Sequence, residues 1–319
     1  MNESTRIAIV GAGAIAREHI LAFLDIPNVE VAGICAPSST RSAKIASEFS
    51  IPNVFVSPEQ MCRSVRPDGV VVAVPVAETK TVCVSLLGST KLLLVEKPLG
   101  CNLEEAEAIT EQARNKGVSI FVALNRRHFS STKAVMDSLS IDQGQRIVLV
   151  RDQEDIRPEL VIGHPKKVIE NWMFANSIHL VDYFTMFCRG DLVKVKNSND
   201  WTPGSPQFML SHLTYSSGDL GVYEAIWNRP SPWSVSITTA ISNYELRPLE
   251  SLTIRKSSKP ICNIEADLID QQFKPGFREQ AQQFVNAIRG ASHSLPSLES
   301  TMCSIRLVDS LYSSRRGEI

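Results

Sequence analysis

Small residues near the start of the chain are spaced as a phosphate-binding loop. Gly11, Gly13 and Ala16 follow an apolar run at residues 7–10. Gly11 permits a tight turn, Gly13 lets a pyrophosphate approach the backbone, and Ala16 keeps the following helix close to its strand. The helix start adds free N–H groups and a favourable dipole; a tight turn that binds nothing is the alternative. The candidate cofactor residues of this loop are Gly11, Gly13, Ala14 and Ile15.

The adenosine end of such a site usually carries an acid at the end of the second strand, where it binds the ribose hydroxyls. Residues 34–41 read Ile-Cys-Ala-Pro-Ser-Ser-Thr-Arg and contain no acid. A carboxylate would repel a 2′-phosphate, so its absence favours NADP slightly over NAD. Ser38 and Arg41 are candidates to contact that phosphate. A polar helix start with a solvated arginine explains the same residues equally well.

Further polar motifs follow the apolar runs at the places where parallel strands would end beside a ligand-binding crevice. They are Val74-Pro75, Glu96-Lys97-Pro98 and Asn125-Arg126-Arg127, and later Ser177–Asp182 and Lys274–Gln280. In this order, over nearly the whole chain, they resemble the glucose-fructose oxidoreductase, inositol dehydrogenase and rhizopine catabolism (Gfo/Idh/MocA) family of NAD(P)-dependent oxidoreductases.

The resemblance implies roles for particular residues. Lys97 would lie between nicotinamide and substrate, where its charge would favour a developing alkoxide. His179 would exchange the hydroxyl proton as the general acid or base. The resemblance also implies cofactor contacts from Val74, Pro75, Glu96, Lys97 and Asn125. For Asn125, loop structure is an equal alternative.

One position departs from the family pattern. The family usually has an aspartate one turn before the histidine, and that position is Ala175 here. Asn176 is three residues from His179 and could contact the substrate, but it cannot take a proton. Trp172 could stack on a sugar face or pack in the core. The expected substrate-binding residues are Lys97, Arg126, Trp172, Asn176 and His179. For Asp182 a structural role is favoured over orienting His179.

The elements that must position these residues change in character along the chain. Up to about residue 125, apolar runs alternate with amphipathic stretches, which is typical of a doubly wound parallel (Rossmann) sheet. After that, longer strands separated by turn signals predict a mainly antiparallel open sheet with helices on one face. A helix is expected at about 173–186, and two more close the chain. We expect a dinucleotide-binding α/β domain at 1–125 and an α+β substrate and oligomerisation domain at 126–319, with the last helices possible neighbours of the first domain.

Composition limits the kinds of partner and location. The formal net charge is -1, so no basic field favours nucleic acid. No apolar run reaches the roughly 18 residues that a membrane span needs. Seven scattered cysteines without a Cys-x-x-Cys pair favour reduced thiols in a cytoplasmic protein, and no metal-ligand spacing is present.

Together these observations predict an oxidoreductase of sugar metabolism that interconverts a secondary alcohol and a ketone on a sugar, sugar nucleotide or cyclitol by direct hydride transfer. A non-catalytic NAD(P)-binding regulator on the same fold is the alternative, kept open by Ala175. The expected partners are a small sugar-like molecule and further copies of the chain. An open sheet with one uncovered face would form a homodimer or homotetramer.

Overall fold

The computed structural model describes residues 4–142, 144–202 and 206–313, which form two compact units. Of the described residues, one unit contains those from 4 to 128 together with Leu268–Thr301, and the other contains those from 129 to 267 and from 302 to 313. Among the described residues, no helix has the length and hydropathy needed to cross a membrane. The same residues hold no group of three or more His, Cys, Asp or Glu side chains that could bind a metal ion.

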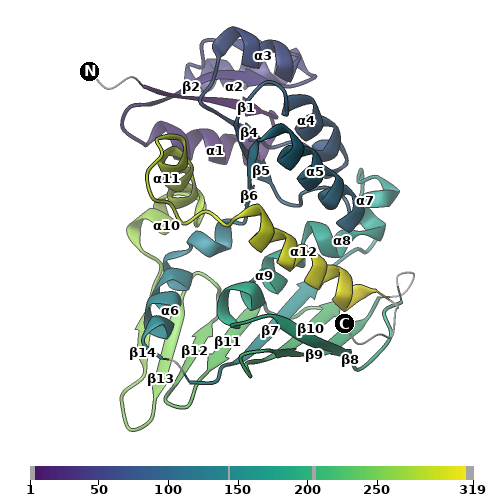
Figure 1. Ribbon diagram of the computed structural model, residues 1–319, viewed down its shortest axis with the longest axis vertical. Coiled ribbons are helices and arrows are strands. Elements are labelled where there is room, and N and C mark those ends of the chain that lie inside the picture. The colour runs from purple at the N-terminus through teal and green to yellow at the C-terminus, as the bar shows by residue number, and fades with distance from the viewer. Residues whose placement is uncertain (1–3, 143, 203–205, 314–319) are drawn as a thin grey trace. The chain divides into compact units, whose positions relative to one another are not determined.

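The first unit is built on a six-stranded parallel sheet in the order β3-β2-β1-β4-β5-β6 (Figure 1). Its strands are β1 (Thr5–Val10), β2 (Val29–Cys35), β3 (Val54–Phe55), β4 (Gly69–Val72), β5 (Leu92–Glu96) and β6 (Ser119–Ala123). Ile7, Ile9, Val71 and Leu94 are fully buried, as expected for parallel strands covered on both faces. The predicted Rossmann sheet is confirmed.

Helices connect and cover these strands. They are α1 (Ala14–Leu24), α2 (Ser39–Phe49), α3 (Pro58–Val65), α4 (Thr79–Leu86), α5 (Leu103–Lys116), α10 (Leu268–Gln272) and α11 (Phe277–Ile288), with short 3-10 helices at Val76–Glu78 and Asn125–His128. Helix α11 packs against α1, where Phe284 meets Phe23 edge to face with 6.2 Å between ring centroids. The late segment from Leu268 to Thr301 thus completes the core of the first unit.

The second unit is built on an eight-stranded sheet in the order β14-β13-β12-β11-β7-β10-β9-β8. Its strands are β7 (Ile147–Glu154), β8 (Leu192–Asn197), β9 (Phe208–Tyr215), β10 (Leu220–Trp227), β11 (Ser234–Thr238), β12 (Ser242–Leu246), β13 (Leu252–Lys256) and β14 (Cys262–Ile264). Within the described part of this sheet, β7 and β10 are the only strands that pair in parallel. The expectation of a mainly antiparallel sheet is confirmed.

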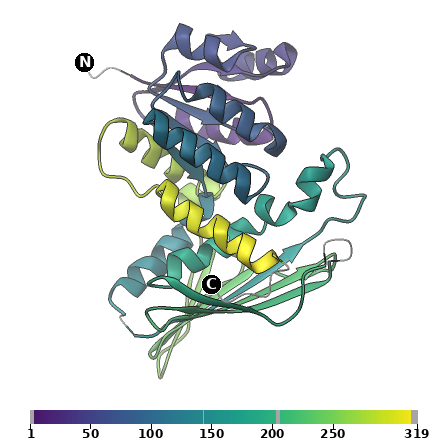
Figure 2. The same cartoon turned by 45° about the vertical axis from the view of Figure 1, so that its right-hand side comes forward.

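The two faces of this sheet differ in burial. On β7, Val148 and Val150 are buried, whereas Ile147 and Leu149 are about two-fifths exposed at 39% and 43%. Helices α6 (Ser130–Ser140) and α9 (Ile178–Phe187) lie on the same side of the sheet (Figure 2). Helices therefore cover one face of the sheet, as the sequence predicts.

The single helix expected at 173–186 is wrong in detail. The structure has two helices, α8 (Trp172–Ala175) and α9, separated by Asn176 and Ser177. Both of these side chains hydrogen-bond to Glu154 of β7. Short polar side chains that find such partners favour helix ends over helix interiors, so the break follows from a contact with a distant strand. The remaining helices are α7 (Lys166–Glu170) and α12 (Leu298–Tyr312).

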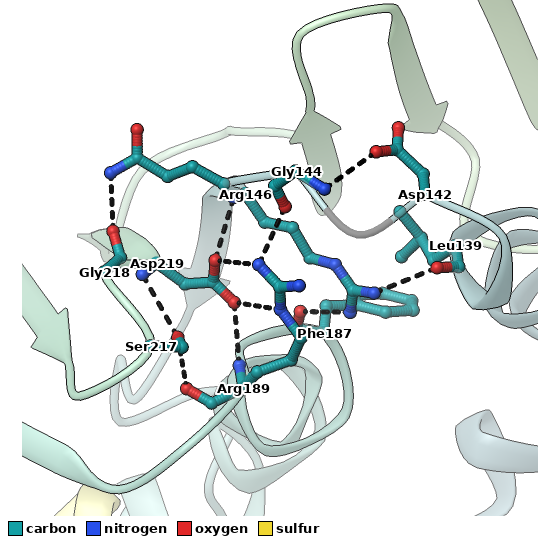
Figure 3. Close-up of polar contacts among 10 residues, drawn as sticks. Leu139, Asp142, Gly144, Arg146, Phe187, Arg189, Ser217, Gly218 and Asp219 are labelled. Atoms are coloured by element: carbon teal, nitrogen blue, oxygen red, sulfur yellow. Dashed lines mark hydrogen bonds and ion pairs between the residues drawn. The ribbon is translucent and has the colours of Figure 1, made fainter.

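An ion pair between the buried Asp219 and the partly exposed Arg189 stabilises one end of this sheet (Figure 3). Asp219 is fully buried and accepts hydrogen bonds from the Arg146 backbone at 2.9 Å and from the Arg189 backbone, Nε and Nη2 at 2.7 to 2.9 Å. Burial raises the pKa of Asp219, but the donors from Arg189 and the Arg146 backbone outweigh it, and the pKa falls to about 2. The Arg146 guanidinium donates to the carbonyls of Leu139 and Phe187, each at 3.0 Å.

Candidate active site

The predicted cofactor residues follow four neighbouring strands. Because β1, β4, β5 and β6 are adjacent in the sheet, their carboxyl ends lie in a row along one edge. Gly11, Val74, Lys97 and Asn125 each come within two residues of such an end. Ligands of open parallel sheets bind in the crevice outside this edge, where the order of connection reverses. That reversal lies between β1 and β4.

The loop after β1 has the form that a pyrophosphate requires. Gly11 has φ +124, and a Cβ on it would lie 2.0 Å from the carbonyl oxygen of Ala73. Gly13 begins α1 with extended backbone, and no side chain caps the helix there. A Cβ on Gly13 would meet nothing within 4 Å. The backbone of the loop therefore requires glycine at position 11. Position 13 leaves open space before the N-terminus of α1. A dinucleotide pyrophosphate fits this arrangement.

The end of β2 has no acidic side chain. Cys35 and Ala36 are buried there, and burial raises the pKa of the Cys35 thiol to about 12. Ser38 caps α2, because its hydroxyl oxygen accepts a hydrogen bond from the Arg41 backbone N–H at 3.4 Å. The hydroxyl hydrogen of Ser38 is not used in this bond. The Arg41 side chain is exposed in the first turn of α2. This leaves a cation and free helix N–H groups near the expected adenosine ribose.

Lys97 is half-buried directly after β5, and the Lys97-Pro98 peptide is cis. Its neighbour Glu96 forms a hydrogen bond with fully buried His19 of α1, with 2.8 Å between Oε1 and Nε2. The Phe277 ring lies 4.8 Å from the imidazole. His19 thus joins the helix of the phosphate loop to the lysine motif. The sequence indicates that His19 is buried, because it falls on the apolar face of α1 with Ala16 and Ile20.

At the end of β6, Asn125 is buried, and its side-chain N–H donates to the carbonyl of Pro275 at 3.0 Å. This bond ties the strand end to the segment that opens α11. Arg126, the next residue, is half-buried. Asn125 therefore has a structural role whether or not its remaining polar atom contacts a ligand.

In the second unit, two of the predicted substrate residues, Trp172 and Asn176, hydrogen-bond to one carboxyl group. Glu154 Oε2 accepts hydrogen bonds from Trp172 Nε1 at 2.9 Å and from Asn176 Nδ2 at 2.8 Å. Glu154 Oε1 lies 3.0 Å from Ser177 Oγ. Glu154 is 1% exposed, whereas Trp172 and Asn176 are half-buried. No sequence motif marks Glu154, although the alternation of β7 places Asp152 and Glu154 on the buried face with Val150.

Comparison with known proteins agrees with this geometry. Residues 5–124 match the model of the GFO_IDH_MocA family, an oxidoreductase family with an NAD-binding Rossmann fold. These residues belong to the Gfo/Idh/MocA family. The resemblance seen in the sequence motifs is confirmed, and with it the nicotinamide dinucleotide as the cofactor class.

Individual relatives extend the Gfo/Idh/MocA likeness. The chain is 28% identical to mouse trans-1,2-dihydrobenzene-1,2-diol dehydrogenase over 42% of this chain and 41% of that protein. It is 25% identical to scyllo-inositol 2-dehydrogenase (NAD(+)) of Bacillus subtilis over 77% of this chain and 73% of that one. The matches span 38 to 58% of the first three curated relatives. A solved dehydrogenase from Chromobacterium violaceum has the same fold, with TM-score 0.85 and 19% identity over 98% of this chain and 95% of its own.

The histidine helix departs from the usual Gfo/Idh/MocA pattern in the way the sequence indicates. His179 lies half-buried on α9, and its backbone N–H donates to the carbonyl of Asn176 at 3.1 Å. Ala175 ends α8 and offers no carboxylate. Asp182 is buried and accepts a hydrogen bond from Ser304 of α12 at 2.6 Å, which gives it a structural contact. Lys97 belongs to the first unit and His179 to the second.

Proposed function

We propose that this Gfo/Idh/MocA protein is an NAD(P)-dependent oxidoreductase that interconverts a secondary alcohol and a ketone on a sugar, sugar nucleotide or cyclitol. The observation that carries the proposal is the glycine cradle at Gly11 and Gly13, which precedes a helix N-terminus in the first unit. The bound nicotinamide would supply the hydride acceptor or donor at its C4 atom. The protein would orient the substrate, exchange its hydroxyl proton and exclude water.

Two side chains carry the proposed chemistry. Lys97 donates a hydrogen bond to the reacting oxygen and stabilises the charge that develops on it. His179 takes the hydroxyl proton during oxidation and returns it during reduction. Asn176 keeps its amide oxygen for the substrate, because its N–H already donates to Glu154. Trp172 presents an indole held through its own N–H to the same carboxyl group.

The cofactor is proposed to be NADP in preference to NAD. The support is the absence of an acid at the end of β2, where Cys35 and Ala36 are buried, together with the exposed Arg41. Arg41 and the N–H groups of α2 would meet the 2′-phosphate. The Ser38 hydroxyl can donate to the same group while its oxygen caps the helix.

The enzyme is also proposed to assemble through the uncovered face of the second unit's sheet. Ile147, Leu149, Phe208 and Leu220 expose 38 to 43% of their surface. Apolar side chains gathered on one sheet face are typical of an interface. A homodimer or homotetramer would cover them, and sedimentation velocity measures the state directly.

The test is turnover of the purified protein. NADPH or NADH oxidation is followed with a panel of keto sugars and inososes, and reduction of NADP⁺ or NAD⁺ with the corresponding alcohols. With the best substrate, Lys97→Met and His179→Asn each lower kcat by at least about 100-fold while NADPH still binds. Lys116→Met, which changes an exposed lysine of α5, is the matched control and keeps full activity. Full activity of Lys97→Met would refute the proposed mechanism.

A non-catalytic regulator is the second candidate, and Ala175 favours it because the usual carboxylate is missing. It predicts that dinucleotide binds but no member of the panel is turned over. A stoichiometric protein partner, whose binding depends on the dinucleotide, would then be expected. Turnover of any panel member excludes a purely regulatory role.

A further inference from the structure

A continuous set of buried polar groups joins two acids of β7 in the second unit. The acid pair is Asp152, 0% exposed, and Glu154, 1% exposed. The hydroxyl chain between them consists of Ser177, Tyr312 and Tyr223. Its oxygen–oxygen distances are 3.0 Å from Glu154 to Ser177, 3.4 Å from Ser177 to Tyr312, 2.7 Å from Tyr312 to Tyr223, and 2.7 Å from Tyr223 to Asp152.

The number of hydrogens in this chain limits its charge. There are four oxygen–oxygen links, and the three hydroxyl groups supply one hydrogen each. If both acids are ionised, two buried charges share the chain and one link has no hydrogen between its oxygens; the longest link, 3.4 Å between Ser177 and Tyr312, is the one that lacks it. One additional proton on the acid pair fills all four links. Burial without a compensating hydrogen bond is unfavourable, so the chain favours a singly protonated pair.

The contacts of Glu154 fit a neutral carboxyl group. Its Oε2 accepts both N–H donors, from Trp172 and Asn176, as the carbonyl oxygen of a protonated acid can. Its Oε1 lies 3.0 Å from Ser177 Oγ, and in the neutral acid this oxygen carries the proton and donates it there. Every hydrogen of the chain then points in one direction, from Glu154 to the carboxylate of Asp152.

We propose that the acid pair holds a single proton on Glu154, which in this form positions the side chains of Trp172 and Asn176. Glu154 is a positioning residue, because it is buried and acts through these two groups. The inference rests on the proposed function in one respect, since it takes Trp172 and Asn176 to face the substrate. It also explains how α8 and α9 are held at their junction without a carboxylate at Ala175.

The electrostatics of the site agree with this assignment. Burial, and then the charge of Asp152, raise the pKa of Glu154 well above its ordinary value, and the hydrogen bonds with Asn176, Ser177 and Trp172 only partly oppose that shift. The ionisable groups that face it are Asp152 on its own strand and Tyr312 of α12, with Tyr223 of β10 beyond. Burial also raises the pKa of both tyrosines, so neither supplies a charge.

Infrared spectroscopy of the full chain without substrate tests the proton. At about pH 7, exposed acids are ionised, so a protonated carboxyl C=O band that shifts in D₂O reports a buried neutral acid. We expect this band in the wild-type protein, unchanged from about pH 6 to about pH 8, and lost in Glu154→Gln. Glu159→Gln, at an exposed glutamate, is the control and keeps the band. Absence of the band from the wild-type protein, or its persistence in Glu154→Gln, overturns the proposal.

Kinetics test the positioning role separately. Glutamine reproduces a neutral glutamate, because its oxygen accepts from Trp172 and Asn176 and its N–H₂ donates to Ser177. Glu154→Gln therefore keeps KM for the active panel sugar within about twofold, whereas Glu154→Ala raises KM at least fivefold or so with NADPH affinity unchanged. An unchanged KM in Glu154→Ala overturns the positioning role. If no sugar is turned over, the proposed function fails while the infrared result still decides where the proton is.

Discussion

Substituting alanine for each glycine of the phosphate loop separates folding from cofactor binding. In Gly11→Ala the new Cβ would lie 2.0 Å from the carbonyl oxygen and 2.7 Å from the carbonyl carbon of Ala73. Both atoms belong to backbone that follows β4, so a side-chain rotation cannot relieve the clash. The residue also keeps φ +124, which an alanine rarely adopts. Backbone strain of about 1 to 3 kcal/mol and overpacking of about 1 to 3 kcal/mol together lower the free energy of unfolding by about 2 to 6 kcal/mol.

Gly13→Ala is the matched comparison. Its Cβ meets nothing within 4 Å, and φ is -97, so the free energy of unfolding changes by less than about 1 kcal/mol. The methyl group nevertheless occupies the space through which the pyrophosphate reaches the N-terminus of α1. We expect the affinity for NADPH to fall at least tenfold or so, equivalent to about 1.4 kcal/mol.

Two measurements decide between these outcomes. Urea denaturation gives the free energy of unfolding of each variant, and quenching or enhancement of NADPH fluorescence gives its Kd. If Gly13→Ala binds NADPH as tightly as the wild-type protein, the pyrophosphate does not approach the backbone at Gly13. The steric argument at position 11 is refuted if Gly11→Ala is as stable as the wild-type protein, since the backbone would then accommodate the Cβ.

Two further predictions concern charge. Asp219→Asn removes the buried carboxylate that pairs with Arg189, whose side chain is 29% exposed, and lowers the free energy of unfolding by about 2 to 3 kcal/mol. Because the folded pKa of Asp219 is about 2, below its unfolded value, its stabilisation is present above about pH 4 and is lost as pH falls toward 2. The stability difference between wild type and variant, from urea melts, must therefore shrink over that range. Arg41→Ala raises KM for NADPH at least about fivefold and leaves KM for NADH within about twofold; equal changes for both cofactors would contradict a 2′-phosphate contact.

Much of the fold follows from local patterns. The apolar runs that become β1, β4 and β5 are continuous over the strand length, and the glycine loop after β1 has few backbone alternatives. The late helix α11 and the strands β9 and β11 of the antiparallel sheet were also expected from the sequence. The short strand β3 was not, because two residues, Val54 and Phe55, are too few for a periodic signal.

The polar contacts between distant segments were decided only by the tertiary structure. His19 meets Glu96 across 77 residues, and Asn125 meets Pro275 across 150. Glu154 reaches Trp172 and Asn176 because strand order places β7 in the middle of its sheet, beneath the α8–α9 junction. A sequence pattern indicates which face of a strand is buried, since side chains alternate along it. It does not state which helix covers that face, because this depends on strand order and register, and these are set by the packing of the whole unit.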